Sequence, residues 1–127
     1  MTHAAWKPVE SDAPPAKGAY SRAARAGNLV FVSGQVPRSF ETGALLGETL
    51  AEQTRGAVAN LRRVLESAGL GLSDIVSVTA YLADIAAWDE FDRVYRELVP
   101  QPYPTRTTLG ANLHGVLVEI NAIAVAR

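Results

Sequence analysis

Two side chains in the second half of the sequence are of types that could do chemistry together. Arg106 lies in the segment PTRTT, and Glu119 lies in LVEIN, between Val118 and Ile120. A guanidinium binds a planar carboxylate through two parallel hydrogen bonds, which a lysine cannot reproduce. A carboxylate on an otherwise apolar strand is costly to bury without a cation, hydrogen bonds or protonation. Arg106 and Glu119 therefore fit a structural ion pair and a shared site equally well, and we expect both near a face that contacts a second subunit.

The composition excludes several other chemistries. The 127 residues include no cysteine and two histidines, which excludes disulfides, thiolate zinc sites, cysteine nucleophiles and any three-histidine metal site. Twelve basic and 13 acidic residues give a net charge of −1, so there is no electrostatic footprint for nucleic acid. No phosphate-binding glycine motif follows a predicted strand. Without a signal-peptide or membrane-spanning apolar run, we expect a soluble cytoplasmic protein that binds no membrane.

The remaining charged clusters have simple structural interpretations. Negative charge near the start of a helix is favoured by the helix dipole. We therefore interpret one acidic cluster as a solvated helix start rather than a metal site: Asp84, Asp89, Glu90, Asp92 and Glu97. Arg62 and Arg63 are interpreted as a solvated helix face, because no aromatic platform accompanies them. His114 lies in a predicted turn, either as a surface residue or as a residue at the rim of a site.

The elements that must position these side chains belong to one domain, residues 1–127, with an extended, proline-containing arm at residues 1–17. The run LVFVSG (residues 29–34) predicts a strand, which can pair with residues 20–26 through a turn at 27–28. Thr49 and Glu52 have capping-box spacing and start a predicted helix. That helix carries an apolar stripe and ends at Gly69.

The second half of the chain predicts a strand over residues 75–83, a helix over 86–99 and strands over 105–110 and 116–126. A further short strand near residues 45–46 is compatible with the pattern. The last strand is apolar on both faces, as are residues 29–32, yet two helices can cover only one face of a sheet. The other face should be buried against a second copy, so we predict a homo-oligomer. The fold class is α+β, with one mixed β-sheet of about five or six strands backed by two helices.

Six segments carry a resemblance to a known family. They are GAYSRA (residues 18–23), GNLVFVSGQVP (27–37), EQTRGAVANLRRVLESAG (52–69), DIVSVTAYLAD (74–84), PTRTTL (104–109) and LVEINAIAV (117–125). In order and spacing, the chain resembles the RidA/YjgF reactive-intermediate deaminases. The resemblance implies a chorismate-mutase-like subunit and a homotrimer whose sheets form a central barrel, with clefts between subunits.

The resemblance also implies an activity and a site. Family members with an intact site hydrolyse enamines and imines such as 2-aminoacrylate and 2-iminopropionate to the keto acid and ammonia, without a cofactor. By this resemblance, Arg106 binds the substrate carboxylate and Glu119 orients the attacking water. Three other positions match cleft residues: Tyr20 on the wall, Ser33-Gly34 at a strand end, and Thr108 beside the substrate. No metal is expected.

This sequence departs from the family pattern at Ala19, Arg22 and Asp92, and in the turn at residues 110–115, which leaves the identity of the substrate open. A larger amino-enoate from a catabolic pathway remains an alternative. A non-catalytic trimer that binds small carboxylates, as a regulator or chaperone-like protein, is another. Arg106 supports both the enzyme and the binding protein, whereas Glu119 favours the enzyme. A ribonuclease fits poorly with the net charge of −1 and the scarcity of histidine.

Overall fold

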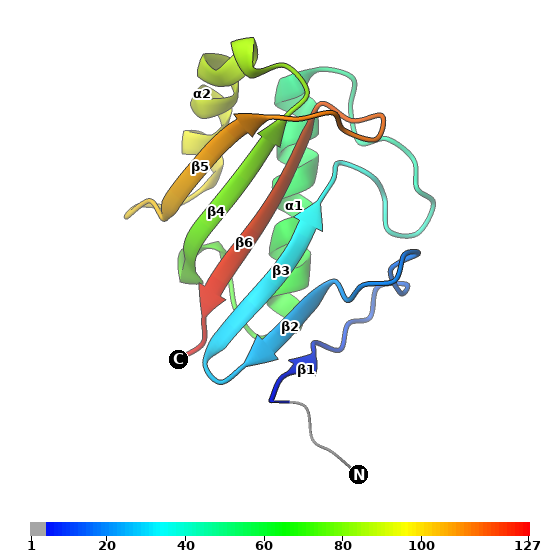
Figure 1. Cartoon of the computed structure of the whole chain (residues 1–127), viewed down its shortest axis with the longest axis vertical. Helices are drawn as coiled ribbons and strands as arrows, with labels where there is room; N and C mark the ends of the chain where they lie inside the picture. The colour runs from blue at the N-terminus through cyan, green and yellow to red at the C-terminus, as the bar shows by residue number, and fades with distance from the viewer. Residues whose placement is uncertain (1–4) are drawn as a thin grey trace.

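A computed structural model describes residues 5–127 and has a six-stranded sheet with two helices on one face (Figure 1). Neighbouring strands are antiparallel except for the parallel pair β4 and β5, so the sheet is mixed. This confirms the α+β fold class. Across the sheet, the strands lie in the order β1 (Lys7–Pro8), β2 (Ala23–Ala26), β3 (Leu29–Gln35), β6 (Val118–Val125), β4 (Ile75–Leu82) and β5 (Thr105–Gly110).

Helix α1 (Leu50–Ser67) begins and ends where its sequence signals predict. The Thr49 hydroxyl accepts the Glu52 backbone N–H at 3.1 Å, and a Glu52 carboxylate oxygen accepts the Thr49 N–H at 3.1 Å. Each side chain thereby satisfies a backbone donor that the helix itself leaves free. Beyond the helix, Gly69 takes a positive φ of 75°, which glycine adopts without steric cost.

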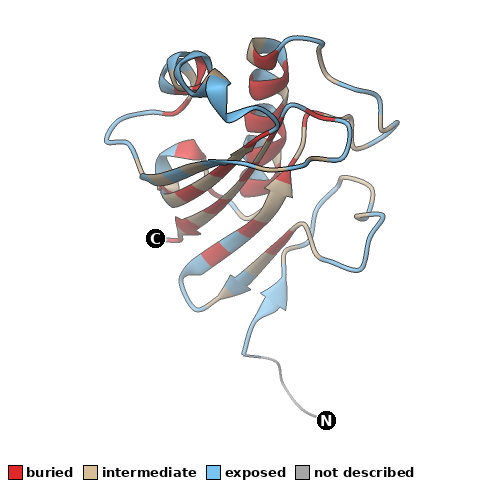
Figure 2. Cartoon of the chain, turned by 45° about the horizontal axis from the view of Figure 1, so that its top comes forward, coloured by how far each residue is buried: buried red, intermediate tan, exposed pale blue. Residues whose placement is uncertain are grey.

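Helix α2 (Trp88–Leu98) follows a 3-10 turn, Ile85–Ala87, in which the Asp84 side chain accepts the Ala86 N–H at 3.0 Å. Phe91 and Tyr95 bury their rings between this helix and the sheet. Both helices therefore cover the same face, and the buried residues lie in the layer between helices and sheet (Figure 2). A second 3-10 turn, Leu72–Asp74, leads from α1 into β4.

Strand β6 has the expected alternation. Val118, Ile120, Ala122 and Ala124 are all buried under the helices. The opposite face, called here the open face, is partly solvent-exposed: Leu29 is 36% exposed and Phe31 is 41% exposed. Exposed apolar side chains on a sheet face are typical of a contact surface.

Some details differ from the sequence-based expectations. Residues 45–46 form no strand; Leu45 makes only an isolated bridge with Arg38. The strand expected over residues 20–26 is shorter and begins at Ala23. Residues 7–8, in the predicted arm, pair with β2 and extend the sheet by one strand. Within residues 5–127, no helix is both long and apolar enough to cross a bilayer.

Candidate functional site

Arg106 lies on the helix-covered face of the sheet, beneath α2. Its strand position pairs in register with Val78, a buried residue that faces the helices. The expectation that Arg106 lies with Glu119 on the open face is therefore wrong. The Arg106 side chain is 13% exposed, its Nη2 lies 2.9 Å from Oδ1 of Asp92, and its guanidinium carbon lies 4.6 Å from the centre of the Tyr95 ring. The guanidinium is thus held by one carboxylate and by the faces of aromatic rings.

Asp92 is the central anion of this group. Its Oδ2 accepts a hydrogen bond from Nη2 of Arg96 at 2.7 Å, while Oδ1 faces Arg106. Burial alone would raise the pKa of the Asp92 carboxyl, but the contacts with Arg96 and Arg106 outweigh it and hold that pKa below its usual value. The interpretation of Asp92 as part of a solvated helix start is therefore wrong. The α2 face that carries it packs beside β5.

Tyr95 completes the surroundings of Arg106. Its ring is 3% exposed, and its hydroxyl has no hydrogen-bond partner among the described residues. Burial raises the pKa of the Tyr95 hydroxyl, so it remains a neutral donor at physiological pH. A pocket of about 240 Å³, called here the arginine pocket, is lined by Asp92, Tyr95, Arg96, Tyr103, Pro104 and Arg106. Buried hydroxyls normally have a partner, so the Tyr95 hydroxyl is an unsatisfied donor beside the arginine pocket.

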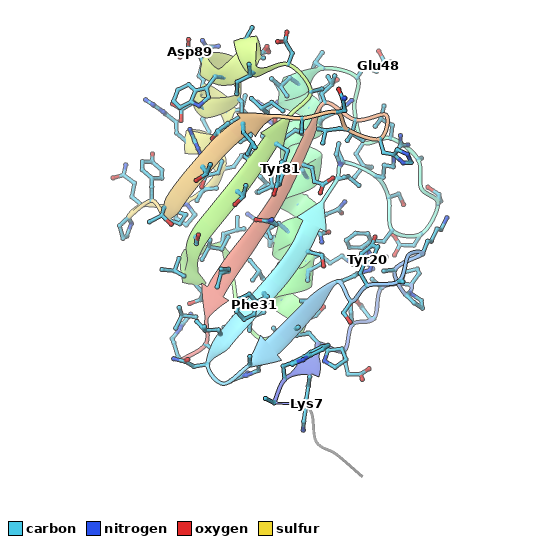
Figure 3. All side chains as sticks on the ribbon, in the orientation of Figure 1. Lys7, Tyr20, Phe31, Glu48, Tyr81 and Asp89 are labelled. Carbon is cyan, nitrogen blue, oxygen red and sulfur yellow. The ribbon has the colours of Figure 1, made fainter. Side chains whose placement is uncertain are left out.

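Glu119 lies on the opposite face of the sheet. On β6 it pairs in register with Tyr81 of β4, and Figure 3 shows Tyr81 on the open face. The Glu119 carboxylate also lies against the backbone of Gly34, where a Cβ would overlap it. Gly34 is therefore required by the close approach of a carboxylate rather than by backbone conformation.

Tyr20 and Gly34 share a second pocket, of about 400 Å³. This pocket, called here the cationic pocket, is also lined by Lys17, Arg22 and Arg38. Tyr20 is 58% exposed at its rim, near the loop that follows β3 (Figure 3).

The two other predicted site residues divide between the two regions. The hydroxyl of Ser33, next to Gly34, donates a 2.6 Å hydrogen bond to the Ser21 carbonyl. This bond anchors the end of β3 to the segment that leads from Tyr20. Thr108 pairs in register with the buried Ala80, so it faces the helices two residues beyond Arg106.

The predicted site residues therefore fall into two groups in a single chain. Arg106 and Thr108 lie on the helix side of β5, whereas the other four, Tyr20, Ser33, Gly34 and Glu119, lie at the end of β3 and on the open face. Within residues 5–127, Arg106 forms its ion pair with Asp92 rather than with Glu119. The same residues contain no cluster of ligands suited to a metal ion.

Sequence reasoning missed the roles of Asp92, Tyr95 and Arg96. Their spacing on α2 was the available signal, because residues three and four apart on a helix share a face. Asp92 thus reaches both Arg96 and Arg106, while the Tyr95 ring lies under the Arg106 guanidinium.

Comparisons with known proteins agree with this architecture. The family model for Endoribonuclease L-PSP matches residues 10–126. A RutC family protein of Pyrococcus abyssi is 38% identical over 114 residues, which cover 88% of this chain and 90% of that protein. Reactive Intermediate Deaminase A of Arabidopsis thaliana, a chloroplastic protein, is 36% identical over 114 residues, which cover 88% of this chain and 61% of the relative.

A solved structure extends the similarity to the fold. The structure of Escherichia coli TdcF with bound serine superposes with a TM-score of 0.84 at 30% identity. The match covers 95% of this chain and 99% of that chain. Sequence and structure thus agree over almost the whole length.

Proposed function

Because the chain belongs to the Rid (YjgF/RidA) family, which the Endoribonuclease L-PSP model describes, we propose that it hydrolyses reactive enamines and imines of small 2-amino acids. The substrates are of the 2-aminoacrylate and 2-iminopropionate type, and the products are the 2-keto acid and ammonia. One observation carries the proposal: Arg106 is a largely buried guanidinium, held by Asp92, that lines a small pocket. The relative from Arabidopsis thaliana, named a reactive intermediate deaminase, supports it.

Arg106 binds the substrate carboxylate. The contact with Asp92 uses one N–H of Nη2, whereas Nε and Nη1 have no hydrogen-bond partner among residues 5–127. Nε and Nη1 lie on opposite edges of the guanidinium, so an incoming carboxylate binds at two points to one of them and to the second N–H of Nη2. The aromatic ring of Tyr95 fixes the plane of the guanidinium, so little conformational freedom is lost on binding. Serine, bound in the TdcF structure, is itself a small amino acid with a carboxylate.

Glu119 orients the attacking water. The enamine first tautomerises to the imine, and the water then adds to the imine carbon to form a carbinolamine. Its C–N bond breaks, ammonia leaves, and the carbonyl forms. Placing the water and the bound imine in one geometry lowers the barrier by several kcal/mol without any cofactor. Gly34 permits this placement because its missing side chain makes room for the Glu119 carboxylate.

The two halves of the site come together between copies of the chain. Arg106 and Glu119 face opposite sides of one sheet, so a cleft that contains both requires residues from two subunits. The exposed apolar residues of the open face supply the contact surface. We propose a homotrimer with its clefts between subunits, as the resemblance to the RidA/YjgF family implies.

A coupled assay tests the activity. A serine/threonine dehydratase generates 2-iminopropionate in situ, and the loss of imine is followed with and without the protein. We expect clear acceleration by the wild type and a loss of about 100-fold in the Arg106→Lys variant, because lysine cannot form the two-point contact. Arg93→Lys is the matched control, since Arg93 is exposed on α2, the helix that covers Arg106.

The assay separates catalysis from binding. Light scattering should show the same assembly for wild type and variant. If the wild type does not accelerate imine loss but calorimetry shows that 2-oxobutyrate binds to Arg106, the protein is a carboxylate-binding trimer rather than a deaminase. Full activity of Arg106→Lys would refute the role of Arg106.

A further inference from the structure

The cationic pocket contains charge that the proposed reaction does not use. Lys17, Arg22 and Arg38 line it together with Tyr20 and Gly34, and none of the described residues that line it is acidic. Three cations around one pocket repel one another and lower stability unless something compensates them.

Arg22 is held in place by neutral groups. Its Nε and Nη2 donate to the Pro14 carbonyl at 3.2 and 2.9 Å, and its guanidinium carbon lies 3.9 Å from the centre of the Phe40 ring. A carbonyl and an aromatic ring position the guanidinium but do not cancel its charge. The position is thus fixed while the full positive charge remains.

Arg38 is held in the same manner. Its Nη1 donates to the Gly43 carbonyl at 3.2 Å and its Nη2 to the Gly115 carbonyl at 3.3 Å. The loop that carries it is anchored from α1, where the buried Asn60 donates to the carbonyls of Val36 and Arg38 at 2.9 and 2.8 Å. Arg38 is therefore also a positioned, uncompensated cation.

The acidic groups nearby do not neutralise the pocket. Glu41, in the same loop as Phe40, forms an ion pair with Arg63 at 2.8 Å, and the charge of Arg22 is the smallest of the effects that lower the pKa of the Glu41 carboxyl. None of Lys17, Arg22 and Arg38 forms an ion pair within the described part of the chain. Glu119 lies against Gly34 and offsets one positive charge of the three. The pocket keeps an excess of positive charge.

We propose that the cationic pocket binds a second, distal carboxylate of the substrate, so that this chain prefers dicarboxylic enamines and imines. The proposal rests on the proposed function, because Gly34 belongs to both regions: it lines the cationic pocket and contacts the Glu119 carboxylate. A substrate whose reacting carbon lies beside Glu119 extends its distal end past Gly34 into the pocket. Positioned guanidinium groups bind such a carboxylate with little ordering cost.

Binding measurements test the pocket independently of turnover. Calorimetry compares 2-oxoglutarate, a dicarboxylic 2-oxo acid, with 2-oxobutyrate, a monocarboxylic one. We expect the wild type to bind 2-oxoglutarate about tenfold more tightly or better. Lys17→Gln and Arg22→Gln should each weaken the binding of 2-oxoglutarate and leave the affinity for 2-oxobutyrate unchanged. Arg25→Gln is the matched control, because Arg25 lies on β2 and does not line this pocket. Equal wild-type affinity for the two acids overturns the proposal.

Two further arms separate the possible failures. Lys17 makes no hydrogen bond or ion pair with any described residue, so Lys17→Gln has no fold contact to lose even if Arg22→Gln lowers the melting temperature. The second arm is competition with inorganic phosphate at the concentration of a competing dicarboxylate. If phosphate displaces 2-oxoglutarate as strongly as the dicarboxylate does, and leaves 2-oxobutyrate bound, the pocket is a site for a free anion and the proposal is overturned. A dicarboxylate preference without turnover of any imine would instead refute the deaminase function and keep the pocket assignment.

Discussion

Replacement of Asp92 by asparagine should strengthen the binding of anionic substrates. The Asp92 carboxylate lies 2.9 Å from Nη2 of Arg106 and 2.7 Å from Nη2 of Arg96. A substrate carboxylate bound to Arg106 would therefore meet a like charge on the same guanidinium. Asparagine keeps the volume and one acceptor oxygen, so Arg106 stays positioned while the repulsion disappears.

The size of the effect follows from Coulomb's law. Two carboxylates on adjacent edges of one guanidinium lie roughly 5 Å apart, and an effective dielectric of about 40, between the values for a protein surface and for water, gives a repulsion of about 1.7 kcal/mol. Asp92 is 20% exposed, so screening by salt reduces this to about 1 kcal/mol. Asp92→Asn should thus lower KM for the imine, and Kd for 2-oxobutyrate, by about fivefold.

The assay measures KM and the calorimetric Kd at low and high salt. The gain from Asp92→Asn should shrink at high salt, because screening already weakens the repulsion in the wild type. Asp89→Asn is the control, since Asp89 is exposed at the start of α2 (Figure 3). Unchanged or weaker binding in Asp92→Asn would refute the reasoning and make Asp92 only a positioning residue for Arg106.

Four further perturbations test other parts of the structure. Gly34→Ala should reduce turnover by about tenfold or more with little change in melting temperature, because the added methyl group displaces only the end of the Glu119 side chain. Asn60→Ala removes two buried hydrogen bonds to loop carbonyls and should lower the free energy of unfolding by about 2 kcal/mol in urea titrations; an unchanged midpoint would contradict this. Hydrogen bonding to a backbone N–H lowers the pKa of the Asp74 carboxyl, so its stabilisation is complete above about pH 4 and is lost as pH falls through the lower folded-state pKa. When the melting temperature is measured against pH, it should therefore fall less steeply at acid pH in Asp74→Asn than in the wild type. Phe31→Glu places a charge on the open face and should shift light scattering towards the monomer, whereas an intact assembly would exclude that face as the contact.

Local sequence signals predicted most of the fold. The capping box at Thr49 and Glu52 is contained in four residues, and the stop at Gly69 depends on one residue's backbone freedom. Neither requires knowledge of the rest of the chain. The alternation in β6 predicted which residues lie under the helices for the same reason. The short strand at Lys7–Pro8 was missed, because its two residues form a strand only through pairing with β2.

The face occupied by Arg106 could not be predicted from the sequence. Its strand, TRTTLG, places polar residues on both faces, so alternation gives no orientation. Only the register with Val78 of β4, which is a long-range property, turns Arg106 towards α2. Asp92 was misinterpreted for a related reason. The helix dipole already explains a carboxylate near the start of a helix, so nothing in the sequence indicated that Asp92 forms an ion pair.

The placement of Arg106 changes the argument for assembly. The apolar open face alone indicates a contact surface but not where a site would lie. Arg106 lies on the edge strand β5, whereas Gly34 and Tyr20 lie at and beyond β3, three strands away in the sheet order. A cleft that contains both groups therefore requires, in the proposed trimer, that the β5 edge of one copy meet the β3 side of the next. Arg106 and Glu119 lie on opposite faces of one sheet, so they cannot share a cleft within a single copy. Each contact between copies then forms one complete cleft, with the cationic pocket at its far end.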